Sequence, residues 1–140
     1  MADITPIKTG LTGVDTSHDG YSTGPMYRVL IAEDSPVIRR LIGICLRGLD
    51  VTVVEEETGP AALEHATTNP PDAMILDVGL PGMEGWEVLR ALRSHPRTAE
   101  LPVLMLTGHA GESVRRKAEA IGASAFMTKP FQPKELRQQL

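Results

Sequence analysis

Short apolar runs alternate with segments of helical periodicity along residues 27–140. Continuous apolar or β-branched runs predict five buried strands, at 29–32, 51–54, 73–76, 103–106 and 123–128. Between these runs, apolar side chains recur at spacings of three and four residues, as in Ile38, Leu41, Ile42 and Cys45. That periodicity predicts a helix after each strand, with the last helix opening at Pro133.

Several helix ends carry recognisable capping residues. Ser35 followed by Pro36 is typical of an N-cap with proline in the first helical turn, and Thr58 is a second candidate N-cap. Gly48 and Gly122 are candidate helix stops.

The regular alternation of strands and helices predicts the topology. Short connections between alternating elements imply parallel strands joined by right-handed crossovers. The expected fold is therefore α/β, with a doubly wound, five-stranded parallel sheet in the order 2-1-3-4-5 and five helices.

Residues 1–26 have a different character from the rest of the chain. Their few apolar residues are scattered among Thr, Ser, Gly and Asp, too sparsely to offset the entropy of ordering. We expect a flexible N-terminal tail at 1–26 followed by one domain at 27–140; the alternative is a segment that folds on a partner. The last helical pattern is still running at Leu140, so either this helix is truncated or the natural protein continues.

Composition narrows the classes of function. A formal net charge of -4 argues against direct nucleic-acid binding, which needs clustered Lys and Arg. Cys45 is the only cysteine, so an intramolecular disulfide is impossible, and its apolar setting predicts a buried, inert thiol. No apolar run approaches the roughly 20 residues of a membrane span, and no secretory signal is recognisable. The expected location is cytoplasmic.

Polar residues follow the predicted strands at one edge of the sheet. Glu33 and Asp34 follow the first strand, Asp77 the third, Thr107 the fourth and Lys129 the fifth. The carboxyl ends of parallel strands form the binding crevice of such folds, and strands 1 and 3 flank the point where the strand order reverses. Asp34 and Asp77 should therefore face each other across the crevice, with Glu33 beside them.

Three carboxylates at close range predict a cation. Like charges raise one another's pKa unless a cation compensates, and Mg²⁺ prefers oxygen ligands completed by water and phosphate; Mn²⁺ is the expected substitute. Lys129 adds a positive charge and Thr107 a hydroxyl donor, which together suit a tetrahedral oxyanion beside the metal. Asp77, central in the crevice, is the candidate nucleophile and would form an aspartyl-phosphate.

Four motifs occur in order along the chain: Val29-Leu30-Ile31-Ala32-Glu33-Asp34-Ser35, Ile75-Leu76-Asp77-Val78-Gly79-Leu80-Pro81-Gly82-Met83-Glu84-Gly85, Leu104-Met105-Leu106-Thr107-Gly108 and Phe126-Met127-Thr128-Lys129-Pro130-Phe131. Together they resemble the receiver domain of two-component response regulators over residues 27–140, in particular the single-domain, chemotaxis-regulator-like members. The resemblance implies a flavodoxin-like fold.

The resemblance assigns a role to each site residue. It implies that Asp77 is the phosphoacceptor and that Glu33 and Asp34 hold the metal, together with Asp77 and the backbone carbonyl of Gly79. It implies that Thr107 and Lys129 contact the phosphoryl oxygens.

The resemblance also implies a conformational switch and a cis peptide. The Lys129-Pro130 bond would be cis, which X-Pro bonds tolerate at low cost. Thr107 would move toward the phosphoryl group and Phe126 would rotate inward; the alternative is that Phe126 is a permanent core residue.

The leading hypothesis is a signalling relay. A sensor histidine kinase or a histidine phosphotransfer protein would donate the phosphoryl group, and a downstream protein target or a fused effector domain would respond. The protein would not be a conventional enzyme, since it catalyses only its own phosphorylation and dephosphorylation. The alternatives are a hydrolase using Asp77, although Gly79 stands where haloacid-dehalogenase-like phosphatases need a second acid, and an interaction module independent of phosphorylation.

Two further residues receive weaker interpretations. His109, two residues after Thr107, is a candidate for tuning phosphoryl loss, with plain exposure as the alternative. Trp86, at the start of a helix, is expected to be partly packed surface.

Overall fold

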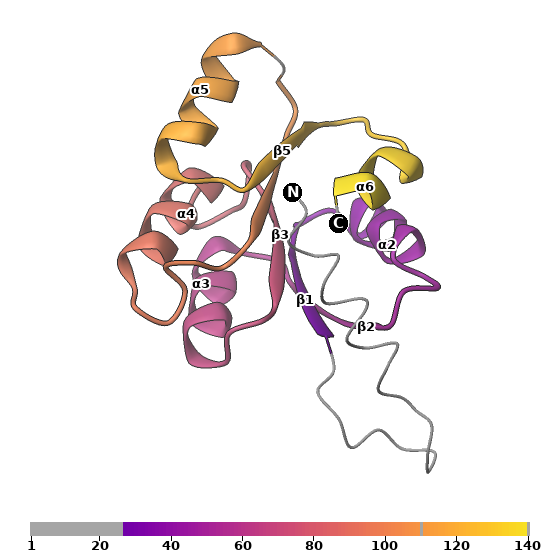
Figure 1. The fold of residues 1–140 in the computed structure, drawn as a ribbon, viewed down its shortest axis with the longest axis horizontal. Helices are drawn as coiled ribbons and strands as arrows, with labels where there is room; N and C mark the ends of the chain where they lie inside the picture. Colours follow the sequence, from indigo (N-terminus) through magenta and orange to yellow (C-terminus); the bar gives the residue numbers. More distant parts are fainter. Residues whose placement is uncertain (1–26, 110, 140) are drawn as a thin grey trace.

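The computed structural model describes residues 27–109 and 111–139 (Figure 1). The predicted tail at 1–26 and the side chain of Leu140 lie outside the described residues. The strands are β1 Tyr27–Ala32, β2 Val51–Glu56, β3 Ala73–Asp77, β4 Val103–Thr107 and β5 Ala125–Thr128. The helices are α2 Pro36–Cys45, α3 Gly59–Thr68, α4 Gly85–Ser94, α5 Glu112–Ile121 and α6 Pro133–Gln139.

The five strands form one parallel sheet in the order β2-β1-β3-β4-β5, which confirms the predicted topology. Helices α3, α4 and α5 cover one face, and α2 and α6 cover the other (Figure 1). Because both faces are covered, both sets of alternating side chains on the central strands are buried.

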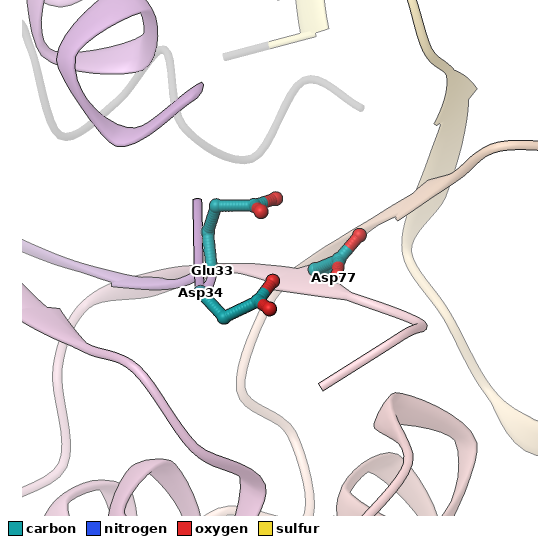
Figure 2. Close-up of side chains that lie close together, drawn as sticks. All are labelled: Glu33, Asp34 and Asp77. Atoms are coloured by element: carbon teal, nitrogen blue, oxygen red, sulfur yellow. The ribbon is translucent and has the colours of Figure 1, made fainter. Parts of the chain in front are cut away.

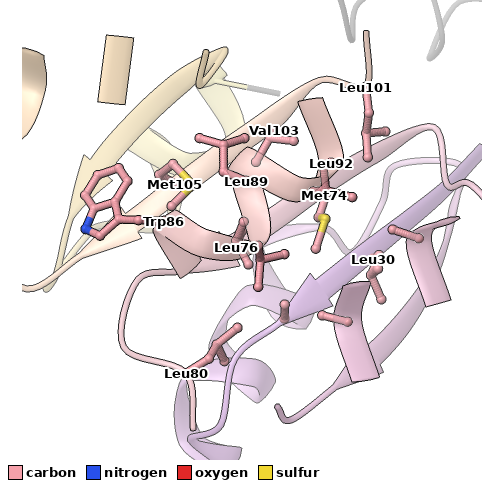
Figure 3. Packing of buried hydrophobic residues seen from close by; sticks show 14 of the residues in the cluster. Leu30, Met74, Leu76, Leu80, Trp86, Leu89, Leu92, Leu101, Val103 and Met105 are labelled. Carbon is pink, nitrogen blue, oxygen red and sulfur yellow. The ribbon is translucent and has the colours of Figure 1, made fainter. Parts of the chain in front are cut away.

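The alternation along β1 shows how the two faces are filled. Leu30 and Ala32 pack into the cluster under α3 and α4, together with Leu89 (Figure 3). Val29 and Ile31 pack into the cluster under α2 and α6. The continuous apolar run is therefore explained by burial on both sides of one strand.

The predicted capping residues of two helices are confirmed. The Ser35 hydroxyl accepts a hydrogen bond from the Ile38 amide at 3.2 Å, and the Thr58 hydroxyl accepts one from the Ala61 amide at 3.2 Å. Each bond satisfies a helix N–H that has no partner inside the helix.

Element ends differ from the sequence prediction in two places. β5 begins at Ala125 rather than 123, because the Ala123 amide donates to the Ala118 carbonyl at 2.9 Å and so completes the end of α5 after the left-handed Gly122. α2 ends at Cys45, and Gly48, with φ of 92°, lies in the following turn rather than at the cap.

Trp86 is buried rather than partly packed surface, so that prediction is wrong. Only 7% of the residue is exposed, and it packs in the cluster under α3 and α4 (Figure 3). The Lys117 ammonium of α5 lies 5.0 Å from the indole centroid, within the range of a cation–π contact. Trp86 lies in the first turn of α4, and the contact from α5 covers its ring there.

Cys45 is buried in the cluster under α2 and α6, as predicted. Burial raises the pKa of its thiol, so the reactive thiolate is disfavoured. Among the described residues, no helix combines the length and apolar character that a bilayer crossing requires.

Candidate functional site

Three carboxylates meet at the carboxyl edge of the sheet (Figure 2). Glu33 and Asp34 follow β1, and Asp77 ends the neighbouring strand β3. One ligand oxygen from each lies within 4.8 Å of the other two, as expected from the predicted strand order. Glu33 and Asp77 are 1% and 4% exposed, whereas Asp34 is open to solvent.

Lys129 is the cation that faces this cluster. Its ammonium lies 2.6 Å from Asp77 Oδ1 and 3.0 Å from Glu33 Oε1. The predicted cis peptide between Lys129 and Pro130 is present, and the Lys129 amide donates to the Thr107 carbonyl at 2.8 Å. The lysine therefore bridges the ends of β1 and β3 from a loop anchored on β4.

The protonation of Glu33 and Lys129 reflects their burial and their pairing. Burial raises the pKa of Glu33, and the nearby Asp77 charge adds to this, against the lowering effects of the Ser35 amide and Lys129. Burial alone would lower the pKa of Lys129, but its close pairing with the Asp77 and Glu33 carboxylates outweighs burial and raises it. In the absence of any metal charge, these shifts make Glu33 an acid that resists ionisation and Lys129 an ammonium that resists deprotonation.

Backbone groups orient the two buried carboxylates. The Ser35 amide donates to Glu33 Oε2 at 3.1 Å, and the Gly79 amide donates to Asp77 Oδ2 at 3.2 Å. Because Ser35 is also the N-cap of α2, the helix start holds Glu33 in place. Each carboxylate therefore has one oxygen held by an amide and the other near Lys129.

The loop after Asp77 packs closely against two glycines, Gly85 at the start of α4 and Gly59 at the start of α3, and leaves no room for a Cβ at either. A Cβ on Gly85 would overlap the Asp77 carbonyl, and the Gly85 amide closes the loop onto the Val78 carbonyl at 2.8 Å. A Cβ on Gly59, at the start of α3, would overlap the Met83 carbonyl. These close backbone contacts hold the loop that carries Gly79, an exposed residue whose amide lies beside Asp77.

Thr107 and Phe126 lie outside the acidic cluster. Thr107 ends β4 at the same edge of the sheet, is 2% exposed, and accepts a hydrogen bond from the His109 amide at 3.1 Å. His109 itself is exposed. Phe126, on β5, is half-buried against the cluster under α3 and α4. The structure therefore gathers Glu33, Asp34, Asp77 and Lys129, with Thr107 on the adjacent strand.

The donor set fits a hard divalent cation. All three acids offer oxygen, the ligand that Mg²⁺ prefers. Within the described part of the chain, Glu33 Oε1 is buried and receives no well-directed hydrogen bond, although the Lys129 charge is near. A buried oxygen in this state suits a cation or its bound water.

Arg39 supports the site, although its sequence position did not single it out. The guanidinium Nη1 donates to the Glu33 carbonyl at 2.8 Å, and Nε donates to Glu55 Oε1 at 2.8 Å. In the sequence it is one of two adjacent arginines, Arg39 and Arg40, on an amphipathic helix, so no local signal distinguishes it.

Comparison with known proteins agrees with this geometry. The family model described as "Response regulator receiver domain" matches residues 29–140. The KDP operon transcriptional regulatory protein KdpE of Escherichia coli is 39% identical over 115 residues, which are 82% of this chain and 50% of that protein. The phosphate regulon transcriptional regulatory protein PhoB of Escherichia coli is 35% identical over 109 residues, 78% of this chain and 48% of that protein. The chain spans about half the length of the curated relatives it matches.

Solved structures share the same fold. A putative response regulator from Chloroflexus aurantiacus has a TM-score of 0.77 and 35% identity, covering 82% of this chain and 94% of that one. The chemotaxis response regulator CheY4 of Vibrio cholerae has a TM-score of 0.75 and 32% identity, covering 83% and 100%. The receiver domain of sensor histidine kinase PA1611 from Pseudomonas aeruginosa, solved with a magnesium ion in its active site cleft, has a TM-score of 0.73 and 28% identity, covering 81% and 93%. The chain belongs to the response regulator receiver domain family.

Proposed function

We propose that Asp77 accepts a phosphoryl group from a phosphohistidine in a Mg²⁺-dependent reaction. An Asp77 carboxylate oxygen forms the new O–P bond while the P–N bond to the donor histidine breaks, and the released imidazole keeps the electron pair and takes up a proton. The observation that carries the proposal is the convergence of Asp77 with Glu33, Asp34 and the Lys129 ammonium at one sheet edge.

Four groups would hold the metal: Glu33, Asp34, Asp77 and the Gly79 carbonyl. Mg²⁺, or Mn²⁺ in its place, supplies charge neutralisation for the phosphoryl oxygens. The exposure of Asp34 and Gly79 supports this assignment, because an incoming phosphoryl donor must reach the metal from solvent.

Lys129 and Thr107 would contact the transferred group. Lys129 already lies 2.6 Å from Asp77 Oδ1, so its ammonium is beside the carboxylate that would form the bond to phosphorus. Phosphoryl transfer depends mainly on positioning and charge stabilisation, which an ammonium and a hydroxyl at this edge provide.

The same residues would link phosphorylation to a surface change. Thr107 would move toward the phosphoryl group, and Phe126 would rotate inward from its half-buried position on β5. A shift between two such states changes what a partner meets at this face.

The partners would be proteins of a cytoplasmic relay. The donor would be a sensor histidine kinase or a histidine phosphotransfer protein. The signal would pass from this chain to a protein target or a fused effector domain. Nucleic acid would be contacted only through such an effector, which agrees with the net charge of -4. The chain would turn over only its own phosphoryl group, unlike a conventional enzyme.

Labelling with acetyl phosphate or a cognate kinase tests this function. Asp77→Asn should abolish acid-labile and base-labile acyl phosphate on the chain, and chelation of Mg²⁺ should do the same to the wild type. Asp50→Asn, which changes an exposed aspartate outside the cluster, is the matched control and should label normally. Undiminished labelling of Asp77→Asn would refute the assignment.

A further inference from the structure

Arg39 links the end of β1 to the end of β2, next to the acidic cluster. Its guanidinium donates to the Glu33 carbonyl through Nη1 and to Glu55 Oε1 through Nε, both at 2.8 Å. Nη2 lies 3.8 Å from Glu57 Oε2. The side chain is only 14% exposed, so the guanidinium is held between β1 and the end of β2.

The carbonyl that Arg39 binds belongs to the peptide between Glu33 and Asp34. On the other side of Glu33, its amide donates to the Glu56 carbonyl at 3.1 Å. Both backbone groups of Glu33 are thus anchored to the end of β2, one directly and one through Arg39 and Glu55.

Asp34 depends on this backbone anchor more than Glu33 does. The Glu33 carboxylate has its own contacts with Ser35 and Lys129. Across 27–109 and 111–139, no protein hydrogen bond or ion pair holds the exposed Asp34 carboxylate. Its position is therefore set by the peptide that precedes it.

We propose that Arg39 is a positioning residue for the metal site, acting by holding the Glu33–Asp34 peptide. This inference rests on the proposed function of the acidic cluster. The planar guanidinium fork reaches a carbonyl and a carboxylate at once, which a lysine ammonium does not reproduce. Groups that orient metal ligands typically contribute about 10- to 100-fold to metal affinity.

The charge of Arg39 and its positioning role have opposite effects on Mg²⁺ binding. A positive charge close to the site repels the cation, so removal of charge alone should tighten binding. Loss of the anchor should weaken it. The sign of the change in Arg39→Gln therefore separates the two effects, and a role in stability alone would leave the affinity unchanged in Arg39→Lys, which keeps the charge.

The experiment is isothermal titration of the metal-free chain with Mg²⁺, at a temperature where thermal unfolding shows each variant folded. Arg39→Gln and Arg39→Lys should both raise Kd by about tenfold, the lower end of the range for such groups. Arg40→Gln removes the same charge from the adjacent, exposed arginine and should not weaken binding. Glu55→Gln weakens the pairing of Arg39 and also removes a negative charge, so it is compared with Glu57→Gln, which removes the same charge from a residue 3.8 Å from Arg39, beyond hydrogen-bond distance. Glu55→Gln should raise Kd more than Glu57→Gln does, which keeps the inference testable if Arg39 variants unfold.

Two results would overturn the inference. Binding by Arg39→Gln that equals or exceeds the wild type would show that only charge matters, and full affinity in Arg39→Lys would show that the fork is unnecessary. Asp34→Asn serves as the separate check on the site itself. If it leaves wild-type binding unchanged, the metal assignment fails and the inference fails with it; if it abolishes binding while Arg39 variants bind normally, only the inference fails.

Discussion

Replacing Lys129 with glutamine tests the electrostatic basis of the site in the metal-free protein. The ammonium is the cation at 2.6 Å from Asp77 and 3.0 Å from Glu33. At about 3 Å and an effective dielectric constant of about 20, each attraction is about 5 kcal/mol before desolvation. Desolvation offsets much of this, and removal of one partner from a buried pair costs about 3–5 kcal/mol net. Because the Lys129 side chain is 24% exposed, we expect the lower end, about 3 kcal/mol at pH 7.

The loss should depend on pH in a defined direction. Burial raises the pKa of Glu33 above its unfolded value, so the stability linked to its protonation is present below the unfolded pKa and is lost as pH rises through the folded pKa. Without Lys129 this carboxyl is still harder to ionise. The destabilisation by Lys129→Gln should therefore be largest at neutral pH and shrink toward about pH 4, near the unfolded pKa of glutamate.

Urea unfolding followed by circular dichroism, in EDTA, measures the effect from the midpoint at constant m-value. In a Glu33→Gln background, the cost of Lys129→Gln should fall to about 1–2 kcal/mol, because only Asp77 then loses its partner. Mg²⁺ should restore part of the stability of the single variant by binding only the folded state. A loss below about 0.5 kcal/mol, within the scatter of surface substitutions, would refute the reasoning, and so would a loss that is the same at every pH.

Three other predictions concern the scaffold of the site. Gly59→Ala should destabilise the fold by about 2–3 kcal/mol in urea unfolding, because its Cβ would overlap the Met83 carbonyl. Gly43→Ala is the control: nothing lies within 4 Å of its Cβ position in α2, so it should be neutral or stabilising by up to about 1 kcal/mol. Ser35→Ala should cost about 1 kcal/mol by removing the N-cap of α2, and an unchanged midpoint would contradict the capping role. Cys45 should react with a thiol reagent only at the rate of unfolding, and rapid labelling of the native chain would contradict its burial.

The sheet and the acidic cluster were predictable because their signals are local and mutually consistent. A run such as Val29 to Ala32 is apolar on both faces, and only a strand covered on both sides accommodates it. The alternation of strands and helices then favours a doubly wound sheet, and the order 2-1-3-4-5 brings Asp34 and Asp77 to one crevice. The inference needed no knowledge of side-chain packing.

Contacts between helices and strand ends were less predictable. The burial of Trp86 depends on how closely α5 packs against α4. Lys117 lies on the exposed face of its own helix, so the sequence pattern indicates only a solvated residue there. Both residues take part in a contact that exists only after the helices pack on the sheet. Periodicity describes which face of one helix is apolar, but it does not say how far a neighbouring helix extends over that face.

Arg39 shows why a residue can matter to a site without a recognisable motif. Its partners are a backbone carbonyl six residues away and a carboxylate sixteen residues away, which meet only because β1 and β2 pair with Ile31 beside Glu55. A carbonyl is present at every position, so the sequence cannot mark the one that an arginine will bind. Side chains that perform the chemistry must be of particular types at strand ends, and they are visible in the sequence for that reason. Side chains that hold the backbone in place need only reach it, so their identification requires the register of the folded sheet.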